Sequence, residues 1–360
     1  MMPERAHLRV RHLRRLTDRI GLLSCGGDWG EPDAFSGYDT RDNAQGLRLA
    51  AYLNEAGIAD DADAWAATYL QFMFQSLRSG QGFRAHREAM GTWTDEVVEP
   101  KELASVVWAL AVASNSELPG VTRDRANALW NIALPFLATV RCPRTAARWL
   151  IAIAARPPAE QRKLEAQADR LARRLVENAY YPLRSSEWEW FDQWFLPGDA
   201  CLPHGLWAAY SILGEQRYAR VAAVTTDFLI EHLFEDGLFV PVGSRGTWPR
   251  HGSKAVFDQY PDDVAATVEL LGYAHDVAGE RAYTQYAEYA HAWFTGNNVK
   301  GISMVDDTTE GVFDALTLKG HTRGQSARAI VSFLLSAATL RRTHAAHAPV
   351  MDLGTVVSLR

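Results

Sequence analysis

The sequence predicts an all-α fold, an (α/α)6 toroid in which six helical hairpins close into a ring. The first observation is helical periodicity, because Ala-rich segments with apolar residues at three- and four-residue spacing recur along nearly the whole chain. The second is a faint repeat of roughly 60 residues, in which a helix ends at a Gly-containing turn. The third is that residues 106–112 and 329–338 are apolar over much of their helical surface, which is typical of helices inside a larger assembly.

The expected helices follow one another closely. A first amphipathic helix runs to about Ile20, and the later ones cover residues 43–56, 62–77, 101–113, 123–137, 145–155, 159–178, 205–213, 217–233, 261–278, 281–294 and 326–341. No alternating run predicts a strand of more than a few residues. We expect one domain over residues 1–343 and a weakly patterned tail over residues 344–360.

The repeat favours a closed ring over an open solenoid. About six helix pairs fit into the chain, and each pair buries its apolar faces only by stacking on its neighbours. The long loops after alternate helices, which carry Gly and Trp, then gather on one face of the ring. We expect functional residues on that face, because loops on a rigid scaffold are where binding and catalysis concentrate.

Composition narrows the function. The chain has 48% hydrophobic and 22% charged residues and a net charge of −6, which is typical of a soluble globular protein. No basic face interleaved with aromatic residues is present, so we expect no nucleic-acid partner. No apolar run is long enough to span a membrane, and no apolar segment follows the basic N-terminus, so neither a membrane partner nor secretion is expected. The twelve Trp residues favour a ligand site.

The cysteines indicate a reduced compartment. Cys25, Cys142 and Cys201 lie far apart, and they form neither a metal-binding pair nor a disulfide framework. We therefore expect a cytoplasmic protein. No oligomeric state is predicted.

Residues 184–195 are the most unusual stretch, with three acids, three Trp and two Phe in twelve residues. An unpaired buried charge is costly, so a pure core segment would not carry Glu187, Glu189 and Asp192. A solvated loop would not carry so many aromatic rings. Acids between flat rings suit a pocket for a sugar, which is polar and has an apolar face. The alternative is a Trp-rich turn with incidental surface acids.

Three further clusters combine polar and aromatic residues before predicted helices. Their candidate ligand-binding residues are Tyr38, Asp39 and Asn43, then Arg245, Trp248, Arg250 and Gln259, and finally His321 and Arg323. One of the polar residues from Asp39 to Asn43 is expected to cap a helix. The adjacent pair Asp262 and Asp263 is likewise interpreted as a helix cap, in preference to a metal-binding pair.

The absence of other catalytic motifs favours chemistry by carboxylate side chains. The sequence contains no HExxH, GxSxG or phosphate-binding loop and no GxGxxG after a strand, and its histidines are scattered. We therefore expect no metal and no cofactor. Two acids on opposed walls of a pocket are sufficient for glycoside hydrolysis, since one protonates the leaving oxygen and the other activates water or attacks.

The same stretches resemble a family of bacterial α/α-toroid proteins found beside or fused to glycosyltransferases. The segments LTDRIG and GYDTRDNA are similar to its LTDxxGI and GYxTDDNARAL patterns, WEWFD to its WPWFE, and PVGSRGTWPR, FDQ and FDAL to its PVGNRGWYPR, FDQQP and FDGLT. The resemblance covers nearly the whole chain and implies a six-hairpin toroid in a carbohydrate context. The chain departs from the pattern in several places, among them Arg41 and Arg328, which stand where the family has acids.

Our first hypothesis is an enzyme that cleaves or transfers a glycosidic bond. Asp42 and Asp192 form the predicted acid/base pair, with Glu189 and Asp258 in reserve. Trp188, Trp190 and Trp248 are expected to stack on sugar rings, and Arg245 and Arg250 to hold polar or acidic substituents.

Two alternatives remain open. The first is a sugar epimerase or isomerase of the N-acylglucosamine 2-epimerase type, for which His204, His251 and His321 are the candidate acid and base. The second is a glycan-binding toroid without catalysis, which the departures at Arg41 and Arg328 favour.

Overall fold

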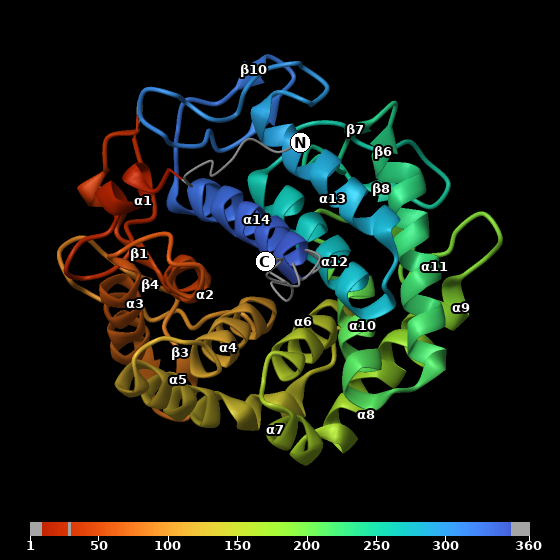
Figure 1. Ribbon diagram of the computed structural model, residues 1–360, viewed down its shortest axis with the longest axis horizontal. Coiled ribbons are helices and arrows are strands. Elements are labelled where there is room, and N and C mark those ends of the chain that lie inside the picture. Colours follow the sequence, from red (N-terminus) through yellow and green to blue (C-terminus); the bar gives the residue numbers. More distant parts are fainter. Residues whose placement is uncertain (1–8, 28–29, 347–360) are drawn as a thin grey trace, which may run out of the picture.

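The protein, seen as a computed structural model that describes residues 9–27 and 30–346, is a ring of helices around a central axis (Figure 1). Six helices form the inner wall, and each contacts the next until the last returns to the first. In chain order they are α2 (Thr40–Glu55), α4 (Pro100–Ser114), α6 (Pro143–Ala154), α10 (Cys201–Leu213), α12 (Pro261–Ala278) and α14 (Ala327–Ala346). The predicted (α/α)6 toroid is confirmed.

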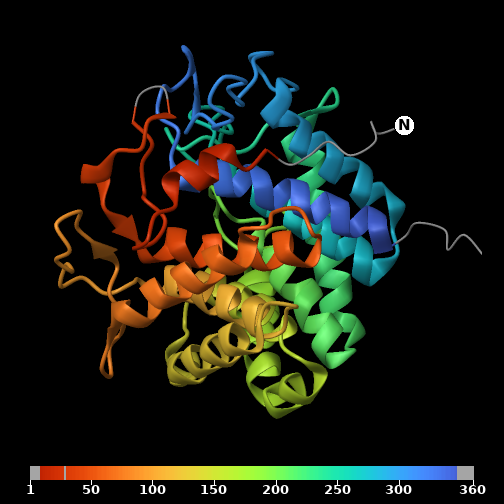
Figure 2. The same cartoon turned by 60° about the vertical axis from the view of Figure 1, so that its left-hand side comes forward.

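An outer layer of helices covers this wall. Its members are α1 (Arg11–Leu16), α3 (Ala62–Ser76), α5 (Gly120–Ala133), α7 (Pro158–Lys163), α8 (Glu165–Arg173), α9 (Tyr181–Leu183), α11 (Gln216–Leu233) and α13 (Arg281–Ala292). Short 3-10 turns η2 (Ala34–Ser36), η3 (Leu134–Thr139) and η5 (Trp293–Thr295) and the π-helical turn η4 (Arg174–Tyr180) extend or join helices. Helix α1 packs on α14, so the first and last helices make one hairpin. Figure 2 shows the inner helices α2 (orange) and α14 (blue) side by side.

The strands are two-residue antiparallel pairs in the loops. They are β1 (Tyr38–Asp39) with β4 (His86–Arg87), β2 (Leu77–Arg78) with β3 (Gly82–Phe83), β5 (Trp194–Phe195) with β8 (Trp248–Pro249), β6 (Phe234–Glu235) with β7 (Leu238–Phe239), and β9 (Leu316–Thr317) with β10 (Gly320–His321). The pair β5 and β8 holds together two loops that are more than 50 residues apart, with Phe195 opposite Trp248.

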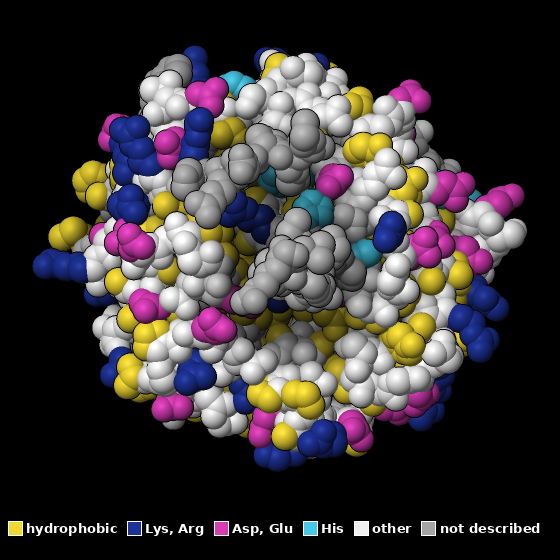
Figure 3. Space-filling model, in the orientation of Figure 1, with side chains coloured by type: hydrophobic (Ala, Val, Ile, Leu, Met, Phe, Trp, Pro, Cys, Tyr) yellow, Lys and Arg dark blue, Asp and Glu magenta, His cyan; other side chains and the backbone are white. Residues whose placement is uncertain are grey.

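The inner helices leave a cavity along the axis. Residues at the start of α2, α12 and α14 line one mouth, and residues at the end of α2, α4, α12 and α14 line the other. These helices therefore all begin at the same end of the ring. The space-filling view is hollowed near the centre of the ring, where Lys or Arg and His side chains gather (Figure 3).

Some boundaries differ from the expectation. The first helix ends at Leu16 instead of near Ile20, because the Asp18 carboxylate accepts hydrogen bonds from the backbone N–H groups of Ile20 and Gly21 and closes a turn. The helix expected at 159–178 is divided at Leu164 into α7 and α8. Helix α14 extends into the predicted tail as far as Ala346, and the rest of that tail lies outside the described residues.

Within the described ranges, no helix combines the length and the apolar character that a membrane crossing needs.

The close approach of α10 to α6 gives a test of the packing. A Cβ on Gly205 would lie 2.5 Å from Ala147 Cα and 2.9 Å from its carbonyl oxygen, so the two helices would have to separate. We expect Gly205→Ala to lower the free energy of unfolding by about 1–3 kcal/mol in urea titrations. Gly120→Ala is the control, since its nearest neighbour would be Arg123 Nη2 at 3.9 Å. Equal stability of the two variants would contradict the close packing.

Candidate active site

The axial pocket is the cavity between the inner helices, and all six of them contribute to its wall. Its polar and aromatic lining consists of Arg41, Asp42, Gln45, Arg48, Ser105, Trp108, Arg148, His204, Asp262, Asp263, Glu269, Arg328 and Ser332. These residues lie on the inward faces of helices that start at the same end of the ring. Four acids and four arginines thus meet in one enclosed space.

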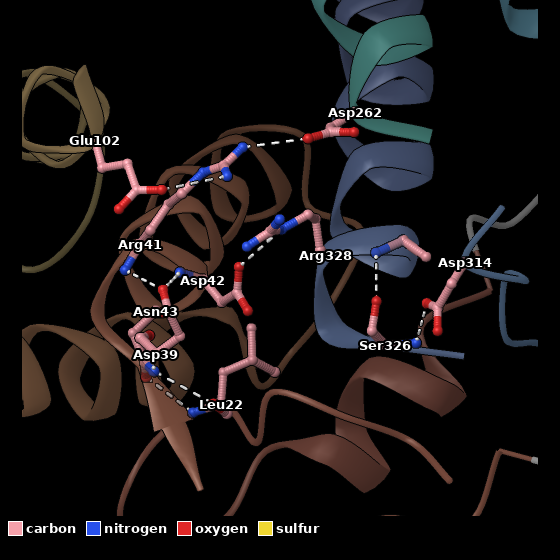
Figure 4. A network of polar contacts seen from close by, with 11 residues as sticks. Leu22, Asp39, Arg41, Asp42, Asn43, Glu102, Asp262, Asp314, Ser326 and Arg328 are labelled. Carbon is pink, nitrogen blue, oxygen red and sulfur yellow. Dashed lines mark hydrogen bonds and ion pairs between the residues drawn. The ribbon is translucent and has the colours of Figure 1, made fainter. Parts of the chain in front are cut away.

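Asp42 enters this pocket because of how α2 begins. The Asp39 carboxylate caps the helix by accepting from the N–H groups of Arg41 and Asp42, which confirms that one of these polar residues is a cap. Asp42 is then in the first turn, nearly buried, with its Oδ1 3.5 Å from Arg328 Nε on α14 (Figure 4). The interaction joins the first inner helix to the last.

A second ion pair links α2 to α12. Arg41 Nη2 lies 3.2 Å from the Asp262 carboxylate, and Arg41 Nη1 lies 3.9 Å from Glu102 on α4. Both acids also raise the pKa of the Arg328 guanidinium. The charge of Asp42 has the largest effect, and the charge of Asp262 has the next largest among the charges. Asp42 and Asp262 therefore face a shared pair of arginines, as Figure 4 shows.

Burial raises the pKa values of two of these acids, Asp42 and Asp263. Desolvation, with the nearby Asp39 charge, raises the pKa of Asp42 to about 6, although Arg328 and Arg41 oppose the shift. Desolvation and the neighbouring Asp262 charge raise the pKa of Asp263 well above its ordinary value. The pocket therefore offers a carboxyl that titrates near neutral pH, which general acid catalysis requires.

The deeper part of the pocket is built on Arg48. Its guanidinium forms an ion pair of 2.9 Å with Glu269 and lies over the Trp108 ring at 3.7 Å from the centroid. The His204 ring packs edge-on against Trp108 and beside Tyr273. Burial, with the positive charge of Arg48, lowers the pKa of His204 to about 3, so this histidine is neutral at physiological pH.

The other predicted acids have partners elsewhere. Asp192 does not line the axial pocket; its Oδ2 accepts from Arg144 Nη1 at 3.1 Å. Glu189 accepts a short hydrogen bond from the Tyr180 hydroxyl. Asp258 is bound by Arg245 Nε, which lies 3.0 Å from each carboxylate oxygen. The structure thus brings none of Asp192, Glu189 and Asp258 into the axial pocket with Asp42.

Two of the three tryptophans expected to stack on sugar, Trp188 and Trp190, belong to the core, and the half-buried Trp248 packs against it. Trp188 is 2% exposed and Trp190 is fully buried, so neither offers a ring face to a ligand. Trp190 stacks on Phe195 at 4.2 Å between centroids, and Trp248 packs against Trp188 at 4.9 Å. The aromatic rings of residues 184–195 fasten the β5–β8 loops to the ring of helices.

Three predicted binding residues are held by internal hydrogen bonds. The Tyr38 hydroxyl donates to Asp18 at 2.6 Å. The Asn43 side chain bonds both backbone polar groups of Leu22, at 2.8 and 3.2 Å. Gln259 accepts from Trp293 Nε1 at 2.7 Å and is fully buried. These side chains hold loops against the helices, whereas Asp39 lines the mouth of the cavity.

The remaining predicted residues lie outside the axial pocket. The backbone N–H of Arg250 donates to Gln193. The exposed His321 stacks on Phe313 with 3.7 Å between centroids, and Arg323 is exposed two residues later. Of the three histidines considered for epimerase chemistry, His204 alone lines the pocket.

Asp262 and Asp263 are not helix caps, which corrects the sequence interpretation. Helix α12 begins at Pro261 with Tyr260 as its N-cap residue, so both acids lie inside the first turn. Their position there directs them into the pocket. Arg48, Trp108, Arg148 and Glu269 also line the pocket, and no sequence motif predicted them. The available signal was the position of each residue on the inward face of a predicted inner helix.

No group of three or more His, Cys, Asp or Glu side chains suited to a metal ion occurs in residues 9–27 and 30–346.

Comparison with known proteins gives structural matches alone. No protein-family model and no curated protein matches the sequence. Among solved structures, a sugar epimerase from a ruminal bacterium matches with a TM-score of 0.71 and 12% identity over 93% of this chain and 97% of that one. A D-mannose isomerase matches with a TM-score of 0.70 and 15% identity over 94% of this chain and 97% of that one.

A hydrolase has the same architecture. The GH76A α-1,6-mannanase from Salegentibacter sp. HEL1_6 matches with a TM-score of 0.65 and 8% identity over 92% of this chain and 96% of that one. At such identities these likenesses show the fold alone.

The assignment of Trp190 to the core can be tested. We expect Trp190→Ala to lower the free energy of unfolding by about 3–5 kcal/mol, because it leaves a cavity among packed aromatic rings. Trp194→Ala, in the same stretch but at a 48% exposed side chain, is the matched control and should change stability little. Denaturant titration measures both. Equal stability of the two variants would argue that Trp190 is not a core residue.

Proposed function

We propose that this chain is a carbohydrate-active enzyme that hydrolyses or transfers a glycosidic bond in the axial pocket. The observation that carries the proposal is the pairing of Asp42, whose pKa is raised to about 6, with Asp262 across two shared arginines. The architecture supports a sugar substrate, because the matched toroids are described as a sugar epimerase, a D-mannose isomerase and a mannanase. Trp108 on the pocket wall provides an aromatic neighbour for a sugar ring.

Asp42 is the proposed general acid and Asp262 the proposed base. Asp42 donates its proton to the glycosidic oxygen as the bond to the anomeric carbon breaks. Asp262, which is held by Arg41, accepts a proton from the water or hydroxyl group that attacks that carbon. Proton exchange with solvent then restores both groups. Arg328 stabilises the Asp42 carboxylate that forms when the proton leaves.

The choice of base follows from which acids line the pocket. In this chain Asp262 and Asp263 are adjacent and both line the axial pocket. We therefore place the base within this pair, instead of at Asp192 as the sequence suggested.

The acid/base assignment predicts the effect of single substitutions. On a glycoside found by screening oligosaccharides and aryl glycosides, with and without phosphate, we expect Asp42→Asn and Asp262→Asn each to lower kcat/KM by about 10²–10⁴. Wild-type activity should decline as the pH rises above about 6, because Asp42 must carry its proton. Full activity in both variants would refute the assignment. A larger loss in Asp192→Asn than in Asp262→Asn would restore the first pairing.

Arg328 should tune that pH dependence. Its positive charge lowers the pKa of Asp42, so Arg328→Gln should raise this pKa and move the alkaline limb of the kcat/KM profile to higher pH. Arg328→Lys keeps the charge and should move the limb less. Folding of both variants is checked by circular dichroism. An unchanged limb, or one moved to lower pH, would show that Arg328 does not control the acid.

A sugar epimerase or isomerase is the second candidate. His204 favours it, because this neutral histidine lines the axial pocket beside the acids. Proton transfer at carbon would leave deuterium on the sugar in D2O, whereas glycoside cleavage would not. Proton NMR of the candidate sugars incubated with the protein in D2O distinguishes the two. Calorimetric binding without turnover in either assay would instead support a binding toroid, in which Arg41 and Arg328 neutralise the acids.

A further inference from the structure

Arg148 differs from the other arginines of the axial pocket because its charge has no counterpart. The others each pair with a carboxylate: Arg41 with Asp262 at 3.2 Å, Arg48 with Glu269 at 2.9 Å, and Arg328 with Asp42 at 3.5 Å. In the part of the chain that the structure describes, no hydrogen bond or ion pair involves the Arg148 guanidinium.

Its neighbour one helical turn earlier shows the contrast. Arg144, also on α6, donates to both oxygens of the buried Asp199 at 2.5 and 2.9 Å and to Asp192 at 3.1 Å. Two acids therefore satisfy Arg144, whereas Arg148 faces the cavity. A partly buried cation without a partner is unfavourable unless something binds it, so the position of Arg148 indicates a ligand.

The surroundings do not cancel this charge. A Cβ on Gly198 would lie 3.6 Å from Arg148 Nη2 and 3.9 Å from Asp263 Oδ1, so both groups border the same part of the pocket wall. Yet the described residues contain no ion pair between them, and burial favours the protonated form of Asp263. The inner helices also begin at this end of the ring, and the positive ends of their dipoles add to the potential.

We propose that the bound sugar carries an anionic group, a carboxylate or a phosphate monoester, and that Arg148 binds it. This inference rests on the proposed function for its sugar, and it adds the chemical class of the substituent. The planar guanidinium presents paired N–H donors that match two oxygens of either group. The sugar then lies between Arg148 on α6 and the Asp42 and Asp262 carboxylates on α2 and α12.

Calorimetry with the full chain tests the inference. The ligands are D-glucose and D-mannose, their 6-phosphates, D-glucuronate and D-mannuronate, and inorganic phosphate. We expect one charged series to bind at least about tenfold more tightly than the neutral sugars, since a charge-assisted hydrogen bond contributes more than 1.4 kcal/mol. The tighter series distinguishes a carboxylate from a phosphate.

Variants connect the preference to the residue. Arg148→Gln should bring the affinities for charged and neutral sugars to within about threefold, and Arg148→Lys should keep part of the preference because the charge remains. The control is Arg220→Gln, at an exposed arginine on the outer helix α11, which should retain it in full. Circular dichroism and thermal unfolding confirm that each variant is folded.

The outcomes separate this inference from the proposed function. Equal binding of charged and neutral sugars, no binding of any charged sugar, or a preference that survives in Arg148→Gln overturns the anion site. If no charged sugar binds, inorganic phosphate binding that is unchanged in Arg148→Gln also overturns the anion site. A preference that depends on Arg148 without turnover of any glycoside keeps the site and refutes the glycosidase. Turnover of neutral glycosides without a preference for charged sugars keeps the glycosidase and refutes the anion site.

Discussion

The packing of α14 against α2 is the contact on which the rest of the site depends. It closes a row of six helices into a ring and brings together residues that are almost 300 positions apart. Only in the closed ring do the first turns of α2, α12 and α14 face one another across an enclosed space. Desolvation in that space, with the nearby Asp39 charge, raises the pKa of Asp42.

The charges in the pocket form a linked set. Arg41 and Arg328 bind the pocket acids Asp262 and Asp42. Each arginine therefore compensates the charge of one carboxylate. Among the described residues Arg148 has no such carboxylate, which agrees with the anionic ligand proposed for it.

The sequence predicted the fold well because helix periodicity is local, and α12 was predicted with its observed bounds. It predicted a pocket position for Asp42 because polar residues clustered just before a helix. It failed where tertiary packing decides. Residues 184–195 have the composition of a sugar pocket, yet the ring of aromatic partners around Trp190 makes them core. Arg148 lies among apolar neighbours on a short helix, and nothing local distinguishes it from the satisfied Arg144.

Closure of the ring by its two chain ends also sets an order of events during synthesis. The apolar face of α2 that packs on α14 is made about 270 residues before its partner, which corresponds to roughly 14–54 s at typical translation rates. Throughout that interval the nascent chain is an open crescent with an uncovered edge. Asp42 is solvated in this crescent, and its pKa rises only when the last helix arrives and buries it.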